Sequence, residues 1–215
     1  MDEAARIRQA LPSLPIFPLP GAVLLPHALV PLHIFEPRYR KMIRDCEAGS
    51  RVLSLANIAG ETDRPPKVLP TIGVGVLARV EPLADGRFNI VLRGISRARI
   101  AEELQTEEPY RLVRAEALRS QPSTADVALA DNLRRLVLAL CATQSGAEPA
   151  ALALLAGKAR DPGDLADVVA GILLDAPEER QAILEELVVA RRLELVIQAV
   201  VRALAECAVP SAGPN

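Results

Sequence analysis

The chain is poor in aromatic residues, histidine and cysteine, and these shortages exclude several classes of protein. It has three Phe, two Tyr, no Trp and two His among 215 residues. The three cysteines, Cys46, Cys141 and Cys207, are far apart in sequence and odd in number. This spacing excludes a disulfide framework and a zinc cluster, and it fits a reducing cytoplasm.

Long apolar runs and an excess of one charge are also missing. No apolar stretch reaches about 18 residues, so we expect no membrane span. Residues 1–10 are charged and lack the apolar core of a secretory signal. The 25 basic and 27 acidic residues leave a net charge of −2, which disfavours strong non-specific binding to nucleic acid.

What is present divides the chain into two halves. All five aromatic residues and 17 basic against 14 acidic groups lie in residues 1–120, while residues 121–215 carry 8 basic and 13 acidic groups. Seven of the 18 prolines fall within residues 12–37. We therefore predict a β-rich subdomain over 1–120, a helical bundle over 121–215 and a disordered tail from about residue 208.

Alternation and turn residues locate the elements of the first half. We expect strands over residues 14–19, 52–58, 73–83, 87–104 and 110–118, and a helix that begins at Pro37 and ends at Gly49. Asp85-Gly86 is a strong hairpin signal. Residues 21–31, interrupted by prolines, are expected to form an irregular loop. Five or six strands around one helix indicate a small barrel-like unit.

The second half has the apolar periodicity of four or five helices. Residues 126–144 carry one apolar face, and residues 190–206 carry another. Asp161-Pro162-Gly163-Asp164 is a helix start signal, and a further helix begins after Asp175. The overall fold class is therefore α+β.

No motif indicates catalysis. Gly157-Lys158 lacks the remaining residues of a phosphate-binding loop, and Gly73-Val74-Gly75 is interpreted as a close approach of backbone within a sheet. His27 and His33 do not have the spacing of a metal pair. No serine has the surroundings of a hydrolytic nucleophile, and the cysteines are expected in the core. We predict no enzyme activity, no cofactor and no metal site.

Two features bear on binding. Five arginines of neighbouring strands form a candidate RNA-binding patch, although nearby glutamates favour a solvated, ion-paired sheet face: Arg93, Arg97, Arg99, Arg111 and Arg114. The apolar, proline-rich segment 22–32 either fills the barrel or lines a groove for a partner.

Two segments resemble a known family. Residues 14–26 (LPIFPLPGAVLLP) and 32–39 (LHIFEPRY) are similar to the substrate-binding N-terminal domain of Lon proteases. Residues 73–75, 85–88 and 92–97 resemble the central hairpin of that domain, and residues 164–167 and 185–194 resemble its helical part. The resemblance covers about residues 13–206.

This resemblance implies an N-terminal PUA-like pseudo-β-barrel followed by a C-terminal α-helical bundle. It also implies recognition of unfolded or partly folded proteins through exposed apolar segments. The ATPase and peptidase signatures of a Lon protease are absent from these 215 residues. The expectation is therefore a stand-alone, non-catalytic cytoplasmic module that serves as an adaptor in proteolysis or quality control, with an ATP-dependent protease or chaperone as partner.

The binding hypothesis names specific residues of the proline-rich segment. We expect peptide contacts from the apolar loop and a polar rim from the next hairpin: Leu24, Leu25, His27, Leu29, Val30 and Arg93. RNA binding by the PUA-like barrel is the alternative function, and a small enzyme that uses His27 or His33 is a third.

Overall fold

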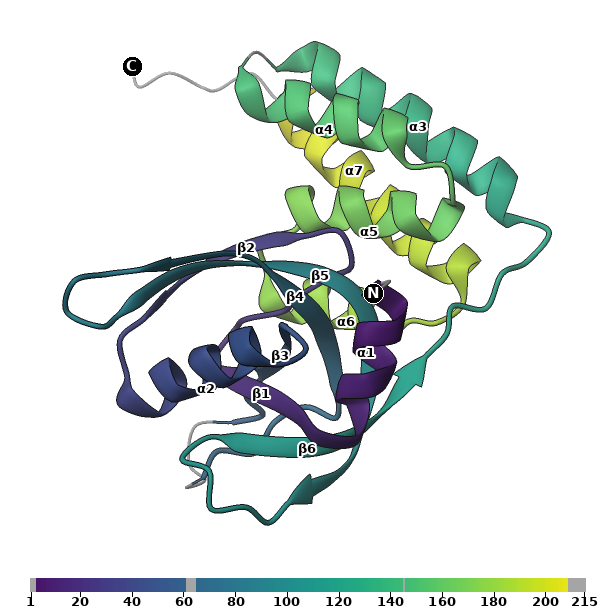
Figure 1. Ribbon diagram of the computed structural model, residues 1–215. Helices are drawn as coiled ribbons and strands as arrows, with labels where there is room; N and C mark the ends of the chain where they lie inside the picture. The colour runs from purple at the N-terminus through teal and green to yellow at the C-terminus, as the bar shows by residue number, and fades with distance from the viewer. Residues whose placement is uncertain (1–2, 61–64, 145, 209–215) are drawn as a thin grey trace. The chain divides into compact units, whose positions relative to one another are not determined.

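A computed structural model describes residues 3–60, 65–144 and 146–208. The tail expected to be disordered lies, from residue 209 onward, outside the described residues. In chain order the elements are α1 (Glu3–Ala10), the 3-10 helix η1 (Leu11–Ser13), β1 (Leu14–Leu19), β2 (Leu29–Ile34), α2 (Pro37–Ala48), β3 (Val52–Asn57), β4 (Thr71–Pro82), β5 (Phe88–Leu104), β6 (Arg111–Leu118), α3 (Asp126–Thr143), α4 (Ala147–Lys158), α5 (Pro162–Leu173), α6 (Pro177–Glu185) and α7 (Val189–Ala208). The predicted α+β class is confirmed (Figure 1).

The chain forms two compact units. The first comprises Met1–Arg119 together with Ala176–Glu185, and the second comprises Ser120–Asp175 together with Glu186–Asn215. Helix α6 therefore belongs to the unit that holds the strands. The sequence predicted one boundary near residue 120, and it did not predict that residues 176–185 would belong again to the first unit.

The six strands form one mixed sheet in the order β2-β5-β4-β3-β1-β6, and β5 also pairs with β6. Strands β5, β4, β3, β1 and β6 thus close on themselves. Only the β1–β3 pair is parallel among the described strands. Strand β2 pairs with the first part of β5, opposite Phe88–Arg93, and forms an edge strand.

Irregularities in the ladder allow the long strands to curve. The β4–β5 register shifts between Val74 and Gly75 and again between Leu77 and Arg79. Such bulges increase the local twist and let one strand serve two parts of a closed sheet. The predicted turn at Asp85-Gly86 is confirmed, and Gly86 has a φ of 79°, which glycine adopts without strain.

Apolar side chains form two core clusters. One gathers around α2, and its central members are Leu24, Ile34, Met42, Ile43, Leu53, Leu55 and Leu92. The other gathers around α1 and η1 and includes Ile7, Leu14, Ile16, Val52, Ile72, Val74 and Val113. Adjacent residues of one strand, such as Leu53 and Val52, belong to different clusters because strand side chains alternate between faces.

The proline-rich segment before β2 fills the barrel. The Leu24 side chain is 0% exposed, and its backbone crosses the sheet at Gly73. A Cβ at Gly73 would lie 1.9 Å from the Leu24 carbonyl oxygen, and one at Gly94 would lie 2.0 Å from the Leu25 carbonyl oxygen. The interpretation of Gly73-Val74-Gly75 as a close backbone approach is therefore confirmed.

A buried ion pair organises the helical unit. Arg192 of α7 and Asp167 of α5 have side chains only 1% and 2% exposed, with 3.3 Å between Nε and Oδ1. The Arg192 guanidinium also donates to the Glu186 carbonyl oxygen at 2.8 Å and to Ser120 Oγ at 3.1 Å. Ser120 and Glu186 are the two residues at which the chain enters the second unit, so Arg192 holds both entry points. Asp161 caps α5 by accepting from Gly163 N at 2.8 Å, as the start signal predicts.

Helix α6 is attached to the first unit through polar contacts. Arg97 of β5, only 5% exposed, donates through Nε to the Leu184 carbonyl oxygen at 3.0 Å. Gln181 donates to the Thr71 carbonyl oxygen at 3.0 Å. Cations near a helix C-terminus stabilise its free carbonyl groups, so Arg97 anchors α6 rather than forming part of an exposed basic patch.

The crossing of Leu24 over Gly73 predicts a large penalty for a single methyl group. Gly73→Ala should lower the free energy of unfolding by about 1–3 kcal/mol because two backbones must separate. Gly157→Ala is the matched control, since a Cβ there meets nothing within 4 Å, and in a helix it should stabilise by up to about 1 kcal/mol. Urea unfolding measures the free energy of unfolding of both variants. Equal values for Gly73→Ala and Gly157→Ala would contradict the close approach at Gly73.

The buried Arg192–Asp167 pair predicts a second large effect. Asp167→Asn should cost about 3–5 kcal/mol, since it removes a carboxylate charge from a buried ion pair whose two side chains are almost fully desolvated. Asp131→Asn removes the exposed partner of Arg134 and should cost less than about 1 kcal/mol. A thermal or urea melt compares the two, and a similar small loss in both would show that Arg192 does not depend on Asp167.

Candidate functional site

Leu24 and Leu25 lie in the interior, which corrects their expected role as peptide contacts. Their side chains are 0% and 1% exposed. Both lie where the segment crosses the glycines of β4 and β5, so a bound peptide cannot reach them in this structure. Leu24 and Leu25 therefore fill the barrel, which was the other interpretation of this segment.

The other four predicted residues lie at or near the surface. His27 is exposed in the left-handed region, with a φ of 67°, and its N–H donates to the Gly94 carbonyl oxygen at 2.9 Å. Leu29 is 62% exposed, and Val30 packs partly against the α2 cluster. Arg93 is half-buried and pairs with Glu3 of α1. Leu29 and Arg93 are register partners on β2 and β5, so the structure brings these two together.

Residues 29–34 form strand β2, where the sequence predicted an irregular loop up to Pro31. The prolines obscured the alternation of Leu29, Pro31 and His33, which are exposed, with Val30, Leu32 and Ile34, which face the α2 cluster. Gly94 N–H donates to the Ala28 carbonyl oxygen. Ala28 thus lies opposite Gly94 at a hydrogen-bonded position of the ladder. Because backbone groups along a strand point alternately toward and away from the neighbouring strand, the backbone of Pro31 points away from β5, toward the free edge of the sheet. The N–H that proline lacks therefore costs no hydrogen bond to β5.

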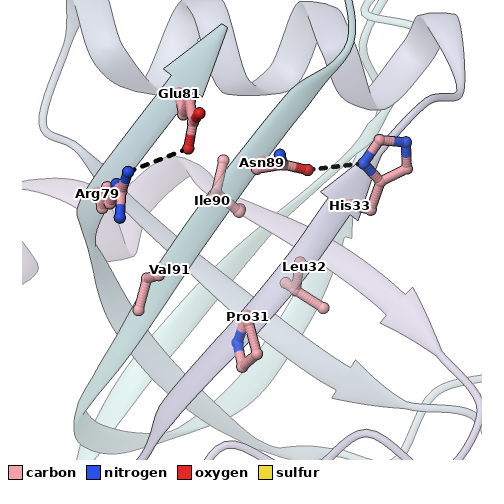
Figure 2. Close-up of a pocket in the computed structure, with 8 residues that line it drawn as sticks. All are labelled: Pro31, Leu32, His33, Arg79, Glu81, Asn89, Ile90 and Val91. Carbon is pink, nitrogen blue, oxygen red and sulfur yellow. Dashed lines mark hydrogen bonds and ion pairs between the residues drawn. The ribbon is translucent and has the colours of Figure 1, made fainter. Parts of the chain in front are cut away.

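The outer face of β2 and the neighbouring strands forms a shallow groove of about 370 Å³. We call it the β2 groove; it is lined by Pro31, Leu32, His33, Arg79, Glu81, Asn89, Ile90 and Val91 (Figure 2). Leu29 is at one end of β2, and Phe35, 61% exposed, follows its other end. Two large exposed apolar side chains thus flank a groove with Pro31 and Val91 among its lining residues.

Sequence reasoning included Leu29 but missed Pro31, Phe35 and Val91. The available signal was the alternation across residues 29–33 followed by the aromatic Phe35. Pairing with β5 was needed to place Val91 beside Pro31, and that register is not visible in a single sequence.

The charges around the β2 groove are paired with one another. Arg79 contacts Glu81 at 3.1 Å on β4, and Arg87 contacts Asp85 at 2.6 Å at the hairpin turn. Hydrogen bonds from the Arg87 side chain and backbone lower the pKa of Asp85 to about 2. Because each of these arginines is paired with a carboxylate, the two pairs add no net charge to the face.

A polar chain runs along one end of the groove. His33 Nδ1 lies 2.8 Å from Asn89 Oδ1, and His33 Nε2 lies 3.2 Å from Arg87 Nη1. The His33 and Phe35 rings stack with centroids 6.3 Å apart. His33 therefore joins the apolar end of the groove to the charged hairpin turn; Figure 2 shows its contact with Asn89.

The cysteines give little support to nucleophilic chemistry. Burial raises the pKa of the Cys46 thiol to about 12 and also raises the pKa of Cys141. A thiol with a raised pKa carries little thiolate at neutral pH. Cys207 is exposed at the end of α7, contrary to the expectation that all three pack in the core. Within residues 3–60, 65–144 and 146–208, no three His, Cys, Asp or Glu side chains are grouped to hold a metal.

The arginines of the candidate RNA patch are largely engaged. Arg111 forms a two-fold contact with Glu103 at 2.6 and 2.7 Å, and Arg114 pairs with Glu102. Arg97 anchors α6. The sheet face is therefore ion-paired, as the favoured interpretation of these arginines predicted, rather than an open basic patch. In the described residues, no helix is long and apolar enough to cross a membrane.

The contrast between Leu25 and Leu29 predicts different stability effects for one substitution. Leu25→Ala should lower the free energy of unfolding by about 2–5 kcal/mol because it leaves a cavity in the core. Leu29→Ala should change it by less than about 0.5 kcal/mol, since the side chain is mostly in solvent. Chemical unfolding of both variants checks this, and a large loss for Leu29→Ala would place that side chain in the core.

Comparison with known proteins agrees with this architecture. The sequence model of the ATP-dependent protease La (LON) substrate-binding domain matches residues 13–202. Lon protease 2 of Myxococcus xanthus is 29% identical over 192 residues, covering 86% of this chain and 23% of the relative. Lon protease of Anaeromyxobacter dehalogenans is 30% identical over 192 residues, covering 86% and 22%. The chain thus spans under a quarter of the length of these relatives.

Solved structures show the same fold. The N-terminal domain of Mycobacterium avium complex Lon protease aligns with a TM-score of 0.71 and 22% identity, covering 88% of this chain and 98% of that one. A Lon N-terminal domain protein from Xanthomonas campestris aligns with a TM-score of 0.62 and 22% identity, covering 86% and 97%. The closed sheet, the helices and the family match agree: the chain belongs to the Lon substrate-binding domain family.

Proposed function

We propose that this chain is a non-catalytic module that binds exposed apolar segments of unfolded or partly folded proteins in the β2 groove. The observation that carries the proposal is the pair of large apolar side chains, Leu29 and Phe35, left 62% and 61% exposed at the two ends of β2. Exposed apolar groups that share a patch usually mark a site of interaction.

The size and chemistry of the groove suit a short extended segment. At about 3.3 Å per residue, the distance along β2 from Leu29 to Phe35 is roughly 20 Å, the length of about six extended residues. Burial of one large apolar side chain supplies about 1.5–3 kcal/mol before ordering costs. Two such contacts give weak binding that tolerates many sequences, which suits a module that meets varied unfolded proteins.

We expect the segment to bind through its side chains on the sheet face, and not as an extra strand added to the β2 edge. An added strand would need backbone donors along that edge, and Pro31 in its middle has none. The segment is therefore held by its side chains against Leu29, Pro31 and Phe35. Arg93, already paired with Glu3, stands at the rim beside Leu29.

The proposed place of this module is proteolysis or quality control in the cytoplasm. The relatives of Myxococcus xanthus and Anaeromyxobacter dehalogenans are named Lon proteases, and this chain matches their substrate-binding part. We propose that it delivers bound proteins, as an adaptor, to an ATP-dependent protease or a chaperone.

Removal of the two exposed apolar side chains should weaken binding. The double variant Leu29→Ser, Phe35→Ser should bind a reduced, unfolded model protein about tenfold less tightly, a loss of about 1.4 kcal/mol. Fluorescence anisotropy measures the affinity at low and high salt, and apolar binding should change little with salt.

The matched control removes two equally exposed apolar side chains of α3, Val127→Ser and Leu138→Ser, which are 66% and 60% exposed in the native chain. This variant should keep the native affinity. Equal losses in both double variants would contradict the β2 groove as the site. Salt-sensitive binding of a short RNA, with none of unfolded protein, would favour the nucleic-acid alternative.

A further inference from the structure

The hydrogen bonds of His33 define its protonation state. A guanidinium has N–H donors and no acceptor, so Arg87 Nη1 can contact His33 Nε2 at 3.2 Å only as a donor. Nε2 must therefore be unprotonated. The ring proton is then on Nδ1, where it donates to Asn89 Oδ1 at 2.8 Å. In this arrangement His33 is a neutral imidazole with both ring nitrogens engaged.

Protonation of His33 is incompatible with the same contacts. An added proton on Nε2 would place an N–H against the N–H of Arg87 and would set two positive charges side by side. The contact must then open. Arg87 remains held by Asp85, whose pKa is lowered by that same partner, so the carboxylate stays ionised under mildly acidic conditions. The charge gained at His33 is thus not cancelled by the hairpin turn.

From α2, the Arg40 guanidinium lies against Gly86 of the hairpin turn and adds a further positive charge there. The neighbouring carboxylates Glu81 and Glu36 are already paired. On β4, Glu81 pairs with Arg79, and Glu36, which follows Phe35, pairs with Arg38. From β5 the register partner of His33 is the neutral Asn89. A protonated His33 would therefore add one positive charge beside Phe35, at the aromatic end of the groove.

We propose that His33 determines the charge preference of the β2 groove, favouring uncharged apolar segments when neutral and segments with a carboxylate beside an apolar residue when protonated. This inference rests on the proposed function of that groove.

The first arm of the test does not depend on peptide binding. NMR of the ring nitrogens of the intact chain reports the tautomer of each histidine. At about pH 8, His33 should carry its single ring proton on Nδ1, because Arg87 can only donate to Nε2. A proton on Nε2 at this pH would overturn the inference.

The second arm compares two short peptides, one of Leu, Phe, Ser and Gly and one with a single Glu beside its Phe. The Glu carboxyl has a pKa near about 4.3 and stays ionised at both pH values. The ratio of the two affinities should shift about two- to fivefold toward the Glu peptide from pH 8 to 5.5, the size expected for an exposed charge pair. His33→Gln, which has no titrating imidazole, should remove this shift in the ratio of the two affinities.

The chain offers a matched control because it has only one other histidine. His27→Asn removes the second imidazole and keeps a residue that tolerates the left-handed backbone. This variant should retain the shift. If the native chain binds the apolar peptide with no pH-dependent change in the ratio, the inference fails while the proposed function stands. If it binds neither peptide at either pH, both fail.

Discussion

The rest of the β-rich unit depends on one close approach of backbones, where Leu24 and Leu25 cross Gly73 and Gly94. A Cβ at these glycines would come within 1.9 and 2.0 Å of a carbonyl oxygen, so neither position has room for any other residue. This crossing buries the apolar segment inside the barrel and directs the chain outward at His27. Strand β2 follows at once, so its position on β5, and with it the β2 groove, is set by how the segment fills the barrel.

The groove combines an apolar face with a neutralised periphery. Its charged side chains form pairs within the face, so an incoming segment need not supply counter-charges. The apolar side chains Leu29 and Phe35 remain in solvent because β2 is an edge strand whose opposite face already covers the α2 cluster. A strand with one buried and one exposed apolar face has a fixed support in the core and, in the proposed function, a surface for binding. Pro31 at the free edge disfavours pairing with another strand, which protects an exposed apolar edge from aggregation.

Much of the fold could be predicted from local signals in the sequence. Strand β1, helix α2, the hairpin turn at Asp85-Gly86 and the Asp161 cap of α5 all depend on residues close in the chain. Strand β2 was missed because its prolines resemble those of a loop when the free edge is unknown. The short helix α1 was not expected, since it depends on packing of Ile7 and Ala10 against the second core cluster.

The candidate site was predictable only in part, for the same reason. Leu29 and Arg93 were predicted as contacts, and the structure makes them register partners. Leu24 and Leu25 were misplaced because their burial depends on glycines far along the chain. The contacts of His33 join it to residues 54 and 56 positions away, so no local pattern reveals its state.

The most direct test of the account is to map the backbone amides of the chain that change when it binds a reduced, unfolded protein, by NMR or hydrogen exchange. Binding in the β2 groove predicts changes concentrated in residues 29–35, which comprise β2 and Phe35, and in residues 89–93 of β5, with little change in α3 and α4. Changes confined to the helical unit, with β2 unaffected, would contradict the β2 groove as the binding surface.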